Sequence, residues 1–229
     1  MMDHSQKPPE ALMRAIAQDL QPVRPSPQPR HLALRMVPLA LLVSSVILLA
    51  IGPRHDAGIL GPLLTWGASA AQFVLAIALV WIAAHESLPA GRLPRQMVYS
   101  AAAAASLVVV LVTLVTFSVS PASETPRVPP WIMGLVCGIG STLAGGILVL
   151  FFSWVFRSSL ATRPAVAGAL YGAGAGLAIN AGWRIACPVS TPWHALGAHG
   201  AAIIATVILG ALIGRSLGNR GVHMGGRRS

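Results

Sequence analysis

The stretch MVYSAAAAASLVVVLVTLVTFSV, residues Met97–Val119, contains no charged residue and decides the class of fold. A helix needs about 20 apolar residues to cross the hydrocarbon of a bilayer, and this stretch supplies them without a break. Of the 229 residues of the chain, 55% are hydrophobic and 10% are charged, and the mean hydropathy is +0.70. A soluble domain of this length cannot bury so much apolar surface. The chain is therefore expected to be a membrane protein.

Five further apolar segments predict an all-α, polytopic membrane protein with a bundle of six transmembrane helices, because backbone exposed to lipid must satisfy its own hydrogen bonds. Proline, glycine and charged residues separate the segments. The six predicted helices are Leu34–Ile51, Leu60–Ala84, Met97–Val119, Trp131–Phe156, Pro164–Ala186 and Trp193–Gly214. This divides the chain into an N-terminal segment (1–33), a transmembrane domain (34–214) and a basic tail (215–229). The first helix is not expected to be a cleavable signal peptide, since its leader is long and lacks a clean small-x-small site.

The basic residues predict the orientation. Of the 16 lysines and arginines, 13 fall on one side of the membrane: in the two terminal segments, in the first turn of the first helix or in two loops. Only Arg54, Arg127 and Arg184 fall on the opposite side, one at each loop. By the positive-inside rule, both termini are expected in the cytoplasm. Topology thus accounts for the net charge of +10, and no direct nucleic-acid partner is predicted.

Small residues recur at helical spacing in the fourth and fifth segments. Gly168, Gly172 and Gly176 share one face of the fifth segment, and Gly134 and Gly138 have the same spacing in the fourth. Small residues let helix backbones approach closely in lipid. We expect these faces to pack within the bundle rather than to form a dimer interface.

Cys137 and Cys187 are the two cysteines of the chain. The loop 157–163 is short, so the fourth and fifth helices should be antiparallel neighbours. Counting from that loop places the two thiols within about 6 Å of the same depth, on the side opposite the termini. A disulfide is permitted there, because that compartment is oxidising in many bacteria. On spacing alone, a thiol sensor and ordinary packing of two small apolar residues both stay open.

His194 and His199 follow Cys187 near the start of the sixth helix. Thiol and imidazole together suit soft and borderline metals, and an ionisable group inside an apolar segment is costly. Residues five apart share the face of an α-helix poorly, however. We therefore favour pairing of these histidines with Arg184 or a loop carbonyl over direct metal ligation. Arg184 is also expected to favour the thiolate form of a nearby cysteine. No cofactor is predicted, and the choice between metal and disulfide stays open.

The N-terminal segment predicts a short helix from Pro9-Glu10 through Leu20, with Leu12, Ile16 and Leu20 on one apolar stripe. Residues 21–30 are rich in proline and should form an extended tether. So short a helix is marginal alone in water and would gain stability in a partner's groove or on lipid headgroups. The alternative is a tail that only orients the protein.

Two stretches resemble a known family. Ala17-Gln18-Asp19-Leu20-Gln21-Pro22-Val23-Arg24 resembles the Asp-Leu-x-Pro-Val-Arg opening of the negative regulator of sigma F (NrsF) family of bacterial inner-membrane anti-sigma factors. Trp183-Arg184-Ile185-Ala186-Cys187-Pro188, followed by His194 and His199, resembles the family's Cys-Pro and downstream His region, and Cys137 matches its earlier cysteine. The chain departs from the pattern at Ala186, where a His often precedes Cys-Pro, and at Ala198, where a Trp often precedes the second His.

The resemblance implies a regulator of transcription and not an enzyme. It implies that an extracytoplasmic-function sigma factor is held at the inner membrane by the N-terminal segment, and that a metal or oxidant acting on Cys137 and Cys187 releases it. The residues expected to bind the sigma factor are Leu12, Ile16, Asp19, Leu20, Pro22, Val23 and Arg24. The departures at Ala186 and Ala198 bear on a metal role of the histidines more than on the cysteines.

Two alternatives are a small transporter and a membrane enzyme subunit. A transporter needs polar groups in mid-membrane, and Gln72 and Asn180 are the clearest candidates. An enzyme needs a nucleophile with a base, or a facing pair of histidines. His85 and His199 are predicted near opposite faces of the membrane and fit neither requirement.

Overall fold

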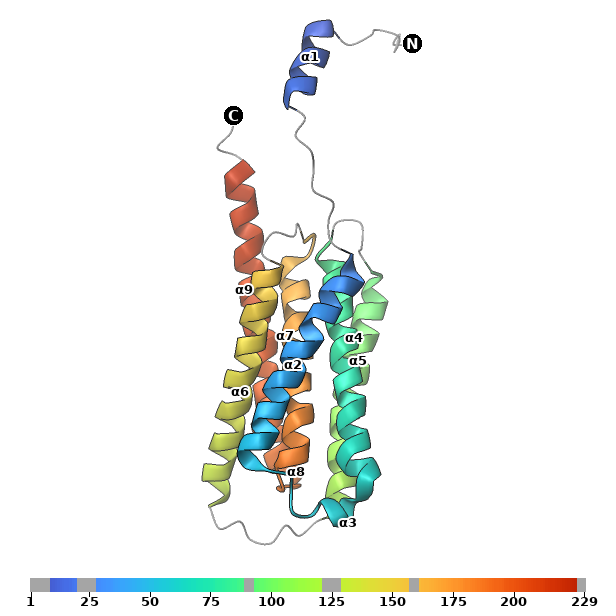
Figure 1. Cartoon of the computed structure of the whole chain (residues 1–229), viewed down its shortest axis with the longest axis vertical. Coiled ribbons are helices and arrows are strands. Elements are labelled where there is room, and N and C mark those ends of the chain that lie inside the picture. The colour runs from blue at the N-terminus through green and yellow to red at the C-terminus, as the bar shows by residue number, and fades with distance from the viewer. Residues whose placement is uncertain (1–8, 20–27, 89–92, 121–128, 157–160, 226–229) are drawn as a thin grey trace.

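The computed structural model describes residues 9–19, 28–88, 93–120, 129–156 and 161–225, and the regular elements within these ranges are helices (Figure 1). They are α1 (Glu10–Asp19), α2 (Pro29–Ile51), α3 (Ala57–Pro62), the π-helix η1 (Leu63–Gly67), α4 (Ala68–Glu86), α5 (Arg95–Val119), α6 (Pro130–Val155), α7 (Pro164–Ala186), α8 (Pro192–His194), the π-helix η3 (Ala195–Gly200) and α9 (Ala201–Gly225).

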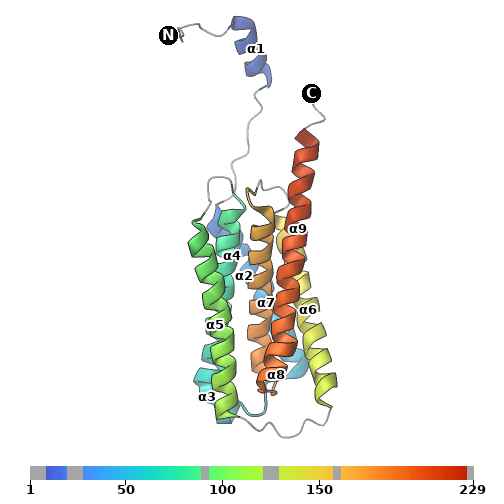
Figure 2. The same ribbon diagram turned by 180° about the vertical axis from the view of Figure 1, so that it is seen from behind.

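Six helical segments are long and apolar enough to cross a membrane, which confirms the predicted all-α polytopic bundle. They run Pro29–Ile51, Ala57–Glu86, Arg95–Val119, Trp131–Val155, Pro164–Ala186 and Pro192–Asn219. Successive spans alternate in direction, so α1 and the end of α9 lie at one end of the bundle (Figures 1 and 2). We call this the terminal end, and we call the opposite end, where α7 finishes and α8 begins, the Cys–His end.

Proline begins several of these helices. Pro29, Pro130, Pro164 and Pro192 occupy the first turn of α2, α6, α7 and α8. A proline ring fixes φ near its helical value and lacks only an N–H that has no partner in a first turn. Pro164 was expected to begin its span, and the structure shows that Pro29, Pro130 and Pro192 also begin helices.

The fifth span, α7, is the centre of the bundle and packs against α2, α4, α6 and α9. Its glycines lie where the neighbouring backbones come closest. A methyl group added to Gly168 or Gly172 would overlap backbone atoms of α9, and one added to Gly176 would overlap Thr206. Close approach of this kind replaces the water-driven association of soluble helices. The predicted packing face of α7 is therefore confirmed.

The corresponding prediction for α6 is wrong for Gly134, and Gly138 packs in the bundle without a close backbone approach. Gly134 has open space where a side chain would project, and Gly138 makes only an ordinary contact with Ala198. The tight positions of α6 are Gly140, which faces the Trp183 ring, and Gly145, which faces Thr206. A four-residue spacing identifies a common face, but only the neighbouring helix determines whether that face is covered.

The first, second and last spans differ from their predicted outlines. The first begins at Pro29 rather than Leu34, so the last two residues of the predicted extended tether are helical. The second begins with the separate turn α3, since Gly61 has φ 70°, and then widens into η1. The last continues past Gly214 as far as Gly225, into the predicted basic tail. Gly214 and Gly218 do not end this helix, because both lie directly against Pro164 at the start of α7. Here glycine permits close packing rather than marking a helix end.

The two mid-membrane amides are hydrogen-bonded to each other. Asn180 of α7 donates a hydrogen bond of 2.9 Å to Gln72 of α4, and both side chains are buried. Paired in this way they join two helices at low cost in an apolar medium. The residues considered for a transport path thus have a structural role in this bundle.

Candidate functional site

The two cysteines meet at the Cys–His end. Cys137 comes from α6 and Cys187 is the first residue after α7, and their Sγ atoms are 3.8 Å apart. Their exposed fractions are only 1% and 6%. A disulfide requires about 2.05 Å between the sulfurs, so these are two free thiols in contact. The juxtaposition expected from their matching depth is present in the structure.

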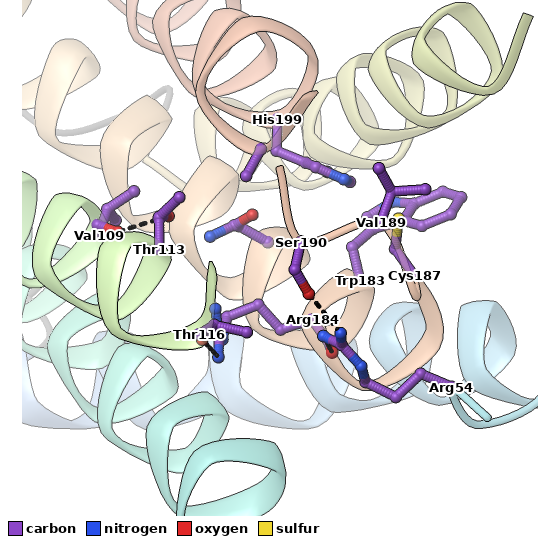
Figure 3. A pocket seen from close by; sticks show the side chains of 12 residues that line it. Arg54, Val109, Thr113, Thr116, Trp183, Arg184, Cys187, Val189, Ser190 and His199 are labelled. Atoms are coloured by element: carbon purple, nitrogen blue, oxygen red, sulfur yellow. Dashed lines mark hydrogen bonds between the residues drawn. The ribbon is translucent and has the colours of Figure 1, made fainter. Parts of the chain in front are cut away.

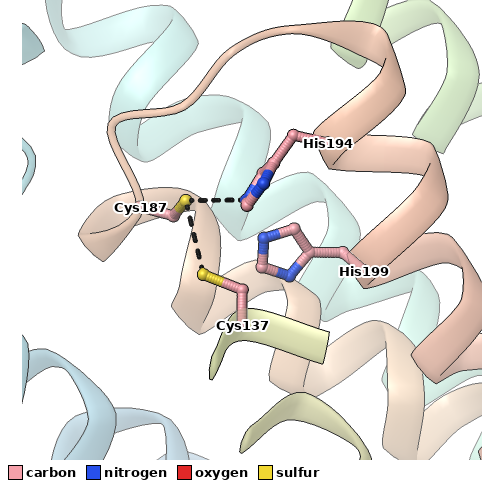
Figure 4. Close-up of side chains that lie close together, drawn as sticks. All are labelled: Cys137, Cys187, His194 and His199. Carbon is pink, nitrogen blue, oxygen red and sulfur yellow. Dashed lines mark hydrogen bonds between the residues drawn. The ribbon is translucent and has the colours of Figure 1, made fainter. Parts of the chain in front are cut away.

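Two histidines complete a compact group with these thiols (Figure 4). Nε2 of His194 lies 3.3 Å from Sγ of Cys187, and Nδ1 of His199 lies 3.3 Å from the hydroxyl of Ser141. One potential ligand atom from each of the four residues lies within 4.8 Å of all the others, and all four residues are buried. We call Cys137, Cys187, His194 and His199 the Cys–His cluster.

A π-helical turn explains why spacing argued against this arrangement. His194 immediately precedes η3, and His199 lies within it. In a π-helix the hydrogen bond joins residues i and i+5, so side chains five apart lie closer to one face than they do in an α-helix. The imidazole centroids are accordingly 5.3 Å apart. The expectation that these histidines diverge assumed α-helical geometry and is corrected here.

Arg184 is not the partner of either histidine in this structure. Its guanidinium donates hydrogen bonds of 3.1 Å to the carbonyl oxygen of Leu64 and to the hydroxyl of Thr116. Leu64, whose carbonyl oxygen accepts one of these bonds, lies in η1, where the backbone departs from the α-helical hydrogen-bond pattern. Arg184 therefore ties α7 to the second and third spans, while the histidines turn to the thiols.

A buried ion pair connects the chain segments of this end. Arg54 donates two hydrogen bonds to the carboxylate of Asp56, at 2.5 and 2.7 Å, and a third of 2.6 Å to Ser190. Ser120 donates to the same carboxylate at 3.0 Å. We call Arg54, Asp56, Ser120 and Ser190 the Arg54 clamp. It joins the segments that follow α2, α5 and α7, next to Cys187.

Charge and burial set the ionisation at this end. Burial opposes ionisation of Asp56, but the hydrogen bonds and charge of Arg54, aided by Ser120, outweigh it and lower the pKa of the carboxyl. A hydrogen bond from Cys137, with further help from His194 and His199, lowers the pKa of the Cys187 thiol against the effect of burial. A lowered thiol pKa favours the nucleophilic, metal-binding thiolate. The other members of the cluster lower the pKa of the Cys187 thiol, whereas Arg184 was expected to do so.

A polar pocket lies beside the cluster (Figure 3). Among its lining residues are Arg54, Thr116, Arg184, Cys187, Ser190 and His199. It is bounded by α5, the end of α7 with the segment that follows it, η3, and Arg54 from the segment after α2, so its polar atoms come from four parts of the chain. A small hydrophilic species in this pocket would be in contact with one thiol and one imidazole of the cluster.

The residues expected to bind a partner lie at the opposite end or outside the described ranges. Leu12, Ile16 and Asp19 belong to α1, where Leu12 is 51% and the adjacent Met13 55% exposed. Leu20, Pro22, Val23 and Arg24 lie outside the described residues. In Figure 1, α1 lies beyond the bundle at the terminal end, far from the Cys–His cluster.

Sequence reasoning missed the Arg54 clamp and Ser141. Arg54 was counted only as a loop charge, and no role was assigned to Asp56. An Arg-x-Asp sequence in a chain with six acidic residues and none within the predicted spans was the available signal. Serines are too common in loops and membrane helices for Ser120, Ser141 or Ser190 to have been distinguished.

These features define a class: a multi-pass helical membrane protein with a buried thiol–imidazole cluster at one end and an exposed amphipathic helix at the other. Residues 16–218 match the family described as negative regulator of sigma F (NrsF). The chain belongs to this family and is therefore a negative regulator of a sigma factor. The family is one of regulators rather than of known enzymes. The comparisons with curated proteins and with solved structures gave no match.

Proposed function

We propose that this protein is a membrane anti-sigma factor that captures an extracytoplasmic-function sigma factor through its N-terminal segment and releases it when a metal or oxidant acts on Cys137 and Cys187. The observation that carries the proposal is the contact of the two thiols at the end of the bundle opposite α1. Capture and sensing would thus be assigned to opposite faces of the membrane.

The exposed apolar side chains of α1 support the capture role. Leu12 and Met13 lie on a helix that makes few contacts with the bundle, so their apolar surface is available to a partner. An amphipathic helix docks by placing such side chains in a groove. The partner of this family is a sigma factor, and α1 with the adjoining residues Leu20, Pro22, Val23 and Arg24 is the proposed binding segment.

The continuous last span supports a route between the two ends. His199 lies in η3, which continues directly into α9, and α9 packs along α7 to the terminal end. When close packing keeps a helix from bending, a displacement of its first turn moves the whole helix. We propose that a change at the Cys–His cluster shifts α9 against the glycine face of α7 and so alters what the terminal end presents.

The proposed orientation places the terminal end in the cytoplasm of a bacterium and the cluster at the outer face of the inner membrane. The excess of basic residues at the terminal end supports this orientation. Reporter fusions after Arg92 or Arg163 should then be cytoplasmic, and fusions within 121–130 should be periplasmic. The opposite pattern would place the thiols on the same side as the sigma factor and would reject the proposal.

The cysteines themselves provide the test of sensing. Cys137→Ser, Cys187→Ser and the double variant should share one phenotype, because loss of either thiol destroys the pair. Each should still repress sigma-dependent transcription but should lose induction across a titration of thiol-reactive metal or oxidant. Ser153→Ala, a change to another residue of α6 outside the cluster, is the matched control. Normal induction in either single cysteine variant would contradict a paired sensor.

A further inference from the structure

We propose that Cys137, Cys187, His194 and His199 bind one Zn²⁺ ion, or its larger congener Cd²⁺, as a tetrahedral Cys₂His₂ site. This inference rests on the proposed function, because it names the class of ligand that acts at the sensing thiols. It goes beyond the proposed function in one respect, because the histidines are ligands of the ion and not merely neighbours of the cysteines.

The separation of the sulfurs fits a metal site better than a disulfide. Two thiolates bound tetrahedrally to zinc at about 2.3 Å lie about 3.8 Å apart. The observed Sγ–Sγ distance is 3.8 Å, so the thiols already have the spacing that such an ion imposes. All four ligand atoms lie within 4.8 Å of one another, and closing the widest pair by about 1 Å completes the tetrahedron.

The chemistry of the donors selects the ion. Two sulfurs and two imidazole nitrogens in a tetrahedron are typical of zinc, whereas magnesium, calcium and manganese prefer oxygen ligands. The cluster contains no carboxylate. Two thiolates also cancel the charge of a divalent cation, so the occupied site is neutral, as a buried position between apolar helices requires.

A neighbouring hydroxyl orients one of the ligands. The hydroxyl of Ser141 in α6 is hydrogen-bonded to Nδ1 of His199 at 3.3 Å. The other ring nitrogen points toward the two sulfurs in Figure 4. A partner that engages the remote nitrogen of a metal-binding histidine fixes its tautomer and ring orientation, and such partners are typical of metal sites. Ser141 is therefore a positioning residue for His199.

The bound ion would join three segments of the chain. Cys137 belongs to α6, Cys187 follows α7, and the histidines begin the last span. Binding replaces the thiol–thiol and thiol–imidazole contacts by four bonds to one centre, and the thiols lose their protons. The segment that carries the histidines runs on into α9 and so to the terminal end, which couples occupancy of the site to the position of α9.

Cadmium titration of the purified full-length protein in detergent tests this inference. Thiolate-to-Cd²⁺ charge-transfer absorption should saturate at one ion per chain, and Zn²⁺ should compete for the site and protect both thiols from alkylation. His194→Ala and His199→Ala should each weaken Cd²⁺ binding roughly tenfold or more, and Ser141→Ala should have a smaller effect. His55→Ala removes an exposed histidine at the same end of the bundle and should leave affinity unchanged.

Several results would overturn the inference. Affinity unchanged in both histidine variants would mean that the thiols bind alone, and absence of the charge-transfer band in the wild-type protein would mean that there is no thiolate site. Capture of the sigma factor by the same preparations, without metal, separates this failure from failure of the proposed function. If capture persists and no ion binds, only the metal site is rejected; if the ion binds and nothing is released, the site stands and the sensing role is rejected.

Discussion

The two ends of the bundle differ in the side chains that they offer to a ligand or partner. At the Cys–His end, polar side chains turn inward, where the Arg54 clamp and the Cys–His cluster join chain segments that are distant in sequence. At the terminal end, Leu12 and Met13 are exposed on α1, outside the bundle. The first arrangement suits a small ligand that bridges buried groups, and the second suits a protein partner. The difference supports the proposal that a small ligand acts at one end and a protein partner binds at the other.

Loss of the apolar face of α1 should have the largest effect. Leu12→Asp together with Leu20→Asp would place carboxylates in the groove that binds this segment, at a cost of several kcal/mol. Sigma-dependent transcription should become constitutive while the abundance of the membrane protein stays normal, as measured with a promoter reporter and by immunoblotting. Arg14→Gln, which removes the exposed ion pair with Glu10, is the control and should have little effect. Full repression by the double variant would show that the segment is only a tether.

Breaking the Arg54 clamp should have the next largest effect, at the opposite end. Arg54→Met leaves Asp56 as a buried, unpaired carboxylate and should lower the free energy of unfolding by about 3–5 kcal/mol. Arg54→Met combined with Asp56→Leu removes both charges and should recover much of that loss. Denaturation in detergent measures the difference. Equal stability of Arg54→Met and the wild type would show that the clamp contributes nothing to this end.

The contact between α7 and α9 links the two ends, and its glycines allow a matched comparison. Gly172→Ala would force a methyl group into the backbone of α9, an overpacking that costs about 1–3 kcal/mol. Gly134→Ala, on the open face of α6, should cost nothing. Gly172→Ala should also weaken induction at the promoter while Gly134→Ala leaves it unchanged. Identical unfolding and induction curves for the two variants would remove α9 from the proposed route.

Acid should produce the smallest change, confined to the Cys–His end. Because the pKa of Asp56 is lowered in the folded protein, its contribution is complete above the ordinary value of 3.8 and is lost only as the pH falls through the lower folded value. Thermal unfolding in detergent should therefore show a loss below about pH 4 that Asp56→Asn lacks. A loss of the same size in that variant would assign the acid sensitivity to another group.

The sequence was sufficient for the bundle because hydropathy and charge act over whole segments. A segment such as Met97–Val119 has few alternatives in lipid, and the ends expected at Ile51, Val119 and Ala186 agree with the structure. The depth of Cys137 and Cys187 also followed from helical rise alone. The geometry of the histidines could not be predicted from the sequence, because it depends on a π-helical turn that no residue type indicates.

The remaining features depend on pairs of segments that no local pattern connects. The partners of Arg54 include the side chain of Ser190 and the backbone carbonyls of Arg184 and Pro188, all far along the chain. Likewise, the spacing of Gly134 and Gly138 equals that of the α7 glycines, but only α7 faces a close neighbour at those positions. Identifying such contacts requires the arrangement of the helices in space.

The separation of roles between the ends can be measured directly in proteoliposomes of known orientation that hold the sigma factor at the terminal end. Cd²⁺ added to the Cys–His side should release the sigma factor from the wild-type protein, and the Cys137→Ser, Cys187→Ser double variant should retain it. Cd²⁺ added only to the terminal side should release nothing. Release from the double variant, or release only when the ion is added to the terminal side, would contradict the assignment of sensing to the Cys–His end.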